Sequence, residues 1–271
     1  MPELPEVETT VRALREPLIG RTMVSVCNDW PRHIATPALT EFQARIRGRR
    51  IEGIERRGKY LVFTLSRGET LIIHLKMTGH LSVVAKDVLA DPYAHTVFVL
   101  DSDQELRFRD PRKFGRVYLV RDPQEVLGAL GPEPLEPDFT VEKLHQQLEG
   151  RKRAIKPLLL DQSFIAGIGN IYADEALYYA GLHPLRRADS LSTANVAALH
   201  ASIGKVLQMG IAREGASIDR YRKPDGTRGN MQNAVAVFRR TGDPCYGCET
   251  GVVQRIVLGG RSTHFCPICQ T

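Results

Sequence analysis

The chain has 271 residues, a formal net charge of +6 and a pI of about 9.1. This length is near the size at which single hydrophobic cores divide, so we expect two domains. No stretch comes near the roughly eighteen consecutive apolar residues of a membrane span, and the start lacks the layout of a secretory signal, so we expect a cytosolic protein. The basic charge is compatible with a nucleic-acid partner but also with many unrelated soluble proteins.

The N-terminal part of the chain is predicted to hold one helix followed by strands. In MPELPEVETTVR, Pro5 and the glutamates suit a helix start, and apolar residues then follow at helical spacing, so residues 2–19 are predicted to be helical. This pattern does not explain Pro2. From residue 23 to about 120 the sequence changes to short β-rich runs such as YLVFTL and TLIIHL. We therefore expect a mostly antiparallel β domain with an N-terminal helix over residues 1–131.

The remainder of the chain is predicted to be a linker, a helical domain and a short tail. Residues 132–139 are rich in proline and indicate a stiff linker. Residues 140–236 show helical patterns, including QSFIAGIGNIYADEAL, where a glycine-spaced turn precedes a helix that begins at Asn170. Backbone N–H groups at such a helix start can bind a phosphate, although tight packing would also explain the glycines.

The C-terminal segment, residues 237–271, contains two C-x2-C pairs. These are Cys245 and Cys248, then Cys266 and Cys269. Four thiolates at this spacing are typical of one structural Zn²⁺, and four unrelated buried thiols are the alternative. Between the pairs, VVQRIVLGGRSTHF predicts a β-hairpin with Arg261 directly after its tip. Taken alone, Arg261 could equally be a solvated strand residue.

A basic loop opened by Asp110 and Pro111 places Arg112, Lys113 and Phe114 in succession. A cation and an aromatic ring at an exposed tip suit insertion into a base stack. The alternative is that Phe114 belongs to the core.

Six motifs in this order resemble the bacterial formamidopyrimidine-DNA glycosylase family (Fpg, MutM) along nearly the whole chain. They are MPELPEVE, RRGKYL, HLKMTG, DPRKFG, IKPLLLDQSFIAGIGNIYADEAL and the zinc finger. The resemblance implies an α+β fold, with an N-terminal β-sandwich and N-terminal helix at residues 1–131, a helix-two-turn-helix domain at residues 140–236 and a four-cysteine zinc-finger hairpin at residues 237–271. It also implies a monomeric DNA glycosylase and AP lyase of base excision repair, found in the bacterial cytoplasm at the nucleoid. Its partner would be damaged double-stranded DNA, from which it excises 8-oxoguanine and formamidopyrimidines.

The family's catalytic residues match positions near the start of this chain. Removal of Met1 would free the amine of Pro2, which attacks the damaged nucleoside, expels the base and forms an iminium ion that acts as an electron sink for β,δ-elimination. Glu3 matches the family's acid/base residue and Glu6 a supporting carboxylate. Lys59 matches a lysine near the lesion phosphate.

The family's DNA contacts match further positions. Met77, Arg112 and Phe114 match the residues that fill the gap left by the flipped base, and Lys156, Asn170 and Arg261 match phosphate-holding residues; Lys113, His74 and His95 complete the set. Lys113 stands where the family commonly has arginine, so it keeps the charge but loses bidentate geometry. A core or surface role is an equal alternative for the two histidines. Residues 213–232 match the loop that closes over the extruded base.

Two other interpretations stay open. A Nei-type glycosylase for oxidised pyrimidines has the same fold and the same N-terminal proline, but Leu4 and the DPRKFG loop favour Fpg. A non-catalytic, zinc-dependent binder of damaged DNA is disfavoured because Pro2, Glu3 and Lys59 are all present.

Overall fold

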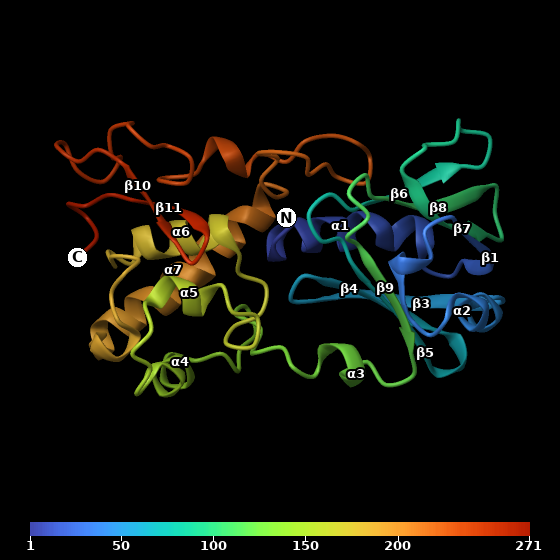
Figure 1. Ribbon diagram of the computed structural model, residues 1–271, viewed down its shortest axis with the longest axis horizontal. Helices are drawn as coiled ribbons and strands as arrows, with labels where there is room; N and C mark the ends of the chain where they lie inside the picture. The colour runs from blue at the N-terminus through green and yellow to red at the C-terminus, as the bar shows by residue number, and fades with distance from the viewer. The chain divides into compact units, whose positions relative to one another are not determined.

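The computed structural model describes residues 1–271 and divides the chain into two compact units (Figure 1). The first unit comprises Met1–Ala129 and Arg213–Asn230, and the second comprises Leu130–Ala212 and Met231–Thr271. The sequence placed residues 213–230 in the helical domain, whereas their contacts lie in the first unit. None of the helices combines the length and the hydropathy that a membrane span requires.

The first unit contains one long helix, a nine-stranded sheet and several short helices. The helix α1 is Leu4–Leu18, and the strands are β1 Thr22–Asn28, β2 Ile34–Thr36, β3 Arg49–Arg57, β4 Tyr60–Leu65, β5 Glu69–His74, β6 His80–Ala85, β7 Ala94–Leu100, β8 Gln104–Arg109 and β9 Arg116–Val120. The short helices are η1 Pro31–His33, α2 Leu39–Ile46, η2 Ser66–Gly68 and α3 Gln124–Leu127. The strand order is β2-β9-β5-β4-β3-β1-β7-β8-β6, with β2 parallel to β9 and the other pairs antiparallel.

The sheet is sandwich-like because its two halves join at a narrow point and share one core. β1 meets β3 only at Thr22 and Met23, whereas the pairings within each half are longer. A single buried cluster contains Phe63 of β4 and Phe98 of β7, one from each half, together with the apolar face of α1. This arrangement confirms the predicted sandwich with its N-terminal helix, and it fixes the start of α1 against a rigid scaffold.

The second unit is helical and ends in a β-hairpin. Its helices are α4 Val141–Leu148, α5 Ile155–Leu159, α6 Asn170–Tyr179, η3 Ala188–Ser190, α7 Thr193–Ala212 and η4 Met231–Asn233, and its strands are β10 Gln254–Leu258 and β11 Arg261–Phe265. α6 begins at Asn170 as the sequence predicted. α5 ends at Leu159, and residues 162–164 form a turn before the glycine-spaced segment. Where α7 passes α6, a Cβ on Gly210 would lie 2.5 Å from the Tyr172 hydroxyl, so this crossing requires glycine.

Candidate active site and DNA-binding surfaces

The carboxylates that follow Pro2 are fixed at the first turn of α1. Glu3 is the extended residue before the helix, and its backbone N–H donates to Glu6 Oε2 at 2.8 Å. The Glu3 side chain accepts from the backbone N–H of Glu6, which completes a capping box. Only 3% of Glu3 and 1% of Glu6 is exposed, and Pro2 is also buried. The helix start therefore holds the three predicted residues in one rigid turn.

The second oxygen of Glu6 binds the segment Arg213–Asn230. The backbone N–H of Ala216 donates to Glu6 Oε1 at 2.7 Å, and the Tyr221 hydroxyl donates to the backbone carbonyl of Glu6 at 3.2 Å. A Cβ on Gly215, whose φ is +82°, would lie 2.9 Å from Glu6 Cγ. Burial first, and then the Glu6 carboxylate, raise the pKa of Tyr221, which keeps its hydroxyl protonated as the donor. These contacts explain why the segment belongs to the first unit.

The same segment is also held internally and at β6. The Arg228 guanidinium donates to the Ser217 carbonyl at 2.8 Å, and the Gly229 N–H donates to the Ser217 hydroxyl at 3.0 Å. His80 Nε2 donates to the Lys223 carbonyl at 2.9 Å. This role of His80 is not predictable from the sequence, because nothing in HLKMTGH indicates a partner so far along the chain.

Lys59 lies close to His74, which is the last residue of β5. Lys59 is in the turn between β3 and β4 and is almost fully buried. His74 lies opposite Tyr60, and its Nδ1 accepts from the backbone N–H of Lys76 at 2.9 Å. Burial, followed by the charges of Lys76 and Lys59, lowers the pKa of His74 to about 3. His74 is therefore a neutral ring that supports the region around Lys59.

The predicted insertion residues lie at exposed positions. Met77 is 44% exposed and Phe114 is 46% exposed, which excludes the core role considered for Phe114. The Arg112 guanidinium lies 4.9 Å from the centre of the Phe114 ring. Lys113 adopts a φ of 59°, in the left-handed region that favours glycine. Arg112 and Phe114 therefore place a cation beside an exposed apolar ring.

His95 is buried rather than freely exposed. Its Nδ1 lies 2.8 Å from Asp29 Oδ1, and its Nε2 has no hydrogen-bond partner. The Asp29 contact fixes the orientation of the ring.

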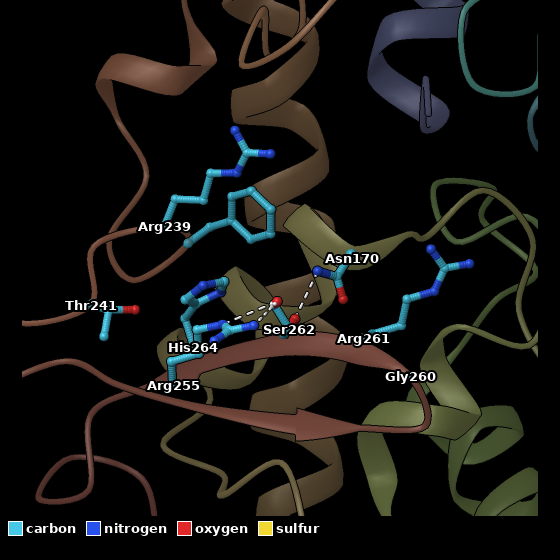
Figure 2. Close-up of a pocket in the computed structure, with 9 residues that line it drawn as sticks. Asn170, Arg239, Thr241, Arg255, Gly260, Arg261, Ser262 and His264 are labelled. Carbon is cyan, nitrogen blue, oxygen red and sulfur yellow. Dashed lines mark hydrogen bonds between the residues drawn. The ribbon is translucent and has the colours of Figure 1, made fainter. Parts of the chain in front are cut away.

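A pocket of about 540 Å³ opens beside the hairpin of the second unit (Figure 2). Asn170 Nδ2 donates to the Ser262 carbonyl at 2.8 Å, while Asn170 Oδ1 is buried without a hydrogen-bond partner. Three arginines line the pocket together with Asn170; they are Arg239, Arg255 and Arg261. Guanidinium groups and amide donors gathered in this way suit an anion.

Lys156 lies inside the second unit, with no exposed surface. Its ammonium lies 2.6 Å from Asp174 Oδ1 and donates to Thr263 Oγ1 at 2.7 Å and to the Ser262 carbonyl at 3.1 Å. Asp174 Oδ2 accepts from the backbone N–H of His264 and lies equally close, at 2.9 Å, to His264 Nδ1. Lys156 therefore holds β11 in place through hydrogen bonds, and the same strand carries Arg261.

The four predicted metal ligands come together at the end of the chain. All four Sγ atoms lie within 4.8 Å of one another, and two of the pairs, Cys245 with Cys269 and Cys248 with Cys266, are 3.7 Å apart. A tetrahedral Zn²⁺ with Zn–S bonds of about 2.3 Å requires sulfurs about 3.8 Å apart, so the donor set fits this ion. A Cβ on Gly251 would lie 2.5 Å from Cys248 Sγ, so the site also requires a glycine there.

The family is shown by comparison with known proteins. The model of the formamidopyrimidine-DNA glycosylase N-terminal domain matches residues 1–117, and that of the formamidopyrimidine-DNA glycosylase H2TH domain matches residues 130–222. A formamidopyrimidine-DNA glycosylase of Chloroflexus aggregans is 50% identical over 275 residues, which cover 100% of this chain and 98% of the relative. A relative of the same name from Herpetosiphon aurantiacus is 48% identical, with 100% of both chains covered.

Solved structures agree with this result. Lactococcus lactis Fpg in complex with DNA containing an abasic site has a TM-score of 0.93 at 37% identity, with 99% of each chain covered. A variant of the Lactococcus lactis protein in complex with DNA containing Fapy-dG also has a TM-score of 0.93, at 36% identity and with 100% of each chain covered. The chain belongs to the formamidopyrimidine-DNA glycosylase family.

Proposed function

We propose that this protein is a bifunctional DNA glycosylase and AP lyase that excises oxidised purines, 8-oxoguanine and formamidopyrimidines, from damaged duplex DNA. The observation that carries the proposal is the placement of Pro2, Glu3 and Glu6 in one buried turn at the start of α1, in a chain of this family. Buried carboxylates next to a nucleophile are the arrangement that acid/base chemistry requires.

The proposed reaction begins with removal of Met1, which turns the nitrogen of Pro2 into a secondary amine. This amine attacks the anomeric carbon of the damaged nucleoside, and the base leaves with its bonding electrons. The nitrogen then loses its proton, and its lone pair expels the ring oxygen of the sugar, which takes a proton from Glu3 as the ring opens to an iminium ion. The resulting iminium has no N–H to lose, so it remains cationic and accepts electrons during β- and then δ-elimination. Strand cleavage follows on both sides of the sugar without an external cofactor.

The remaining site residues have supporting roles in this proposal. Glu3 moves protons to and from the opening sugar ring, because its carboxylate is held next to Pro2 by the capping box. Glu6 holds the segment Arg213–Asn230 against the same turn. Lys59 donates a proton near the lesion phosphate, and the neutral ring of His74 supports it.

In this proposal the DNA is bound by the pocket beside the hairpin of the second unit and by the exposed insertion residues of the first unit. The pocket lined by Asn170 and Arg261 binds backbone phosphates, and Lys156 holds the hairpin that forms one of its sides. Met77, Arg112 and Phe114 enter the base stack where the damaged nucleotide has left it, and part of the unstacking cost is offset by these contacts. His95 and Lys113 lie on the same unit and support binding there.

One structural Zn²⁺ completes the second unit. The four cysteine thiolates would hold it, and because all four positions are filled by the protein, the ion stabilises the hairpin and takes no part in catalysis. The protein acts as a monomer on damaged DNA in the bacterial cytoplasm, associated with the nucleoid.

A cleavage panel tests the proposed function. Duplexes carry 8-oxoguanine opposite each of the four bases, formamidopyrimidine, or thymine glycol. We expect cleavage of the two purine lesions with products of β,δ-elimination, fastest when cytosine is opposite 8-oxoguanine. Preferred cleavage of thymine glycol would instead identify a Nei-type enzyme, and binding without any cleavage would identify a non-catalytic damage binder.

A further inference from the structure

A short segment of the first unit, Asn28–His33, packs against the loop that carries the insertion residues. This segment contains Trp30, the only tryptophan in the chain. The ammonium of Lys113 lies 4.4 Å from the centre of the Trp30 ring, within the range of a cation–π interaction. The middle residue of the insertion loop is therefore held by an aromatic side chain far away in the sequence.

The last residue of the segment, His33, holds the base of the same loop. Its ring is fully buried and stacks on Phe108 with a centroid separation of 4.8 Å. His33 Nδ1 lies 3.1 Å from Thr96 Oγ1, and Nε2 lies 3.4 Å from Asp110 Oδ2. The contacts with Phe108 and Thr96 thus fix the plane of the imidazole and direct its other nitrogen towards Asp110.

Asp110 organises the backbone of the loop. Its Oδ2 accepts from the Gly115 N–H at 2.7 Å, and its Oδ1 accepts from the Arg112 N–H at 3.3 Å. The Thr78 hydroxyl, next to the insertion residue Met77, also donates to Oδ1. One buried carboxylate therefore links both strand connections that carry insertion residues.

The loop needs such support because its conformation is unfavourable for its sequence. Lys113 has a φ of 59°, where a side chain is strained, and the neighbouring Phe114 exposes much of its ring to solvent. The Asp110 contacts hold the loop on either side of Lys113, and Trp30 holds the Lys113 side chain. Arg32 also lies near the Trp30 ring, but it is further away than Lys113, because its guanidinium carbon is 5.8 Å from the ring centre.

We propose that Trp30 and His33 are positioning residues that hold the loop Asp110–Gly115 in one arrangement, and that this arrangement sets the discrimination of the base opposite the lesion. The role in discrimination rests on the proposed function, in which Arg112 and Phe114 enter the base stack. The contacts themselves are properties of the free protein, so they are tested separately from activity.

The first test uses the fluorescence of Trp30 in the free, full-length protein. Lys113→Met removes the cation over the ring and should change the emission intensity and the accessibility of Trp30 to acrylamide. Lys143→Met, which removes an exposed lysine of α4, is the matched control and should leave both unchanged. Identical emission and quenching in Lys113→Met and the wild type would overturn the contact, whatever the protein cleaves.

The second test is a double-mutant cycle on single-turnover excision of 8-oxoguanine opposite cytosine and opposite adenine. Trp30→Leu and Lys113→Met should each lower the cytosine-to-adenine rate ratio by about threefold to tenfold, and the double variant should lower it no further than the larger single effect. His33→Phe, which keeps the stacking on Phe108 but loses the Asp110 contact, should lower the ratio similarly. Unchanged ratios in the single variants, or independent multiplying effects in the double variant, would overturn the proposal. Thermal melts confirm that each variant is folded.

Discussion

The Glu6 carboxylate accepts a hydrogen bond at 2.7 Å from the backbone N–H of Ala216, which lies 210 residues further along the chain. The other oxygen of the same carboxylate accepts from Glu3. One buried side chain therefore joins the helix start that carries Pro2 to the segment Arg213–Asn230. We infer that Glu6 links the order of this segment to the order of the turn at the start of α1.

Replacing Glu6 with glutamine should loosen this segment. The amide retains one acceptor oxygen and presents an NH2 group to a backbone donor, so one charge-assisted hydrogen bond worth about 1.5–3 kcal/mol is lost. Hydrogen exchange at Ala216 should accelerate by about tenfold to a hundredfold. Glu16→Gln, an exposed position on α1, serves as the control. Equal exchange rates at Ala216 in the two variants would show that Glu6 does not hold the segment.

Removing Lys156 should destabilise the second unit. Lys156→Met leaves the Asp174 carboxylate buried without its cation, a change that costs about 3–5 kcal/mol in the free energy of unfolding. Lys156→Met combined with Asp174→Asn should recover part of this loss, because no uncompensated charge remains. Urea unfolding measures the effect, and Lys152→Met provides an exposed control. A cost below about 1 kcal/mol for Lys156→Met would contradict a buried ion pair.

The burial of Lys156 is an example of a feature that could not be predicted from the sequence. The hairpin, the cysteine pairs and the start of α6 were predicted because each depends on a local pattern, namely alternation around Gly259 and Gly260, C-x2-C spacing and a glycine before Asn170. Whether a lysine in the basic run RKRAIK is buried depends instead on how α5 meets β11, which no local pattern encodes. The family resemblance therefore predicted that Lys156 contacts a phosphate, whereas in the structure its ammonium lies against the Asp174 carboxylate.

Contacts over long sequence distances were missed for the same reason. The sandwich and its family were predicted and are confirmed, but the pairing of His33 with Asp110, of His80 with Lys223 and of Glu6 with Ala216 depends on tertiary packing. Trp30 had no assigned role in the sequence because a lone tryptophan fits a core, a surface or a binding site equally well.

The buried ring of His74 should make stability depend on pH. Its folded-state pKa of about 3 lies below the ordinary value of 6.5, so between these values the unfolded chain binds one more proton than the folded chain. Stability is therefore lost as the pH falls below 6.5, by about 2 kcal/mol between pH 7 and pH 5 for this group. His74→Asn should remove this loss, which lowers the slope of unfolding free energy against pH in this range by about 1 kcal/mol per pH unit. An unchanged slope would contradict a neutral, buried His74, and His145→Gln is a partly exposed control.

Removing the metal should affect the second unit alone. Metal analysis should find one zinc per chain, and chelation or Cys266→Ala should release the hairpin, so that Arg261 no longer lines the pocket proposed to bind phosphate. Duplex DNA binding should then be lost while the fluorescence of Trp30, in the first unit, is retained. Full DNA affinity after complete loss of zinc would contradict a structural role for the ion in binding.

The most direct measurement locates the covalent intermediate. Borohydride is added while the protein reacts with a duplex containing 8-oxoguanine, so that it reduces the iminium intermediate to a stable adduct. The adduct is then digested and mapped by mass spectrometry. We predict that the mature chain begins at Pro2 and that the sugar remnant is attached to the nitrogen of this residue. Attachment to a lysine such as Lys59, a chain that retains Met1 in the active fraction, or the absence of any adduct would contradict the proposed nucleophile.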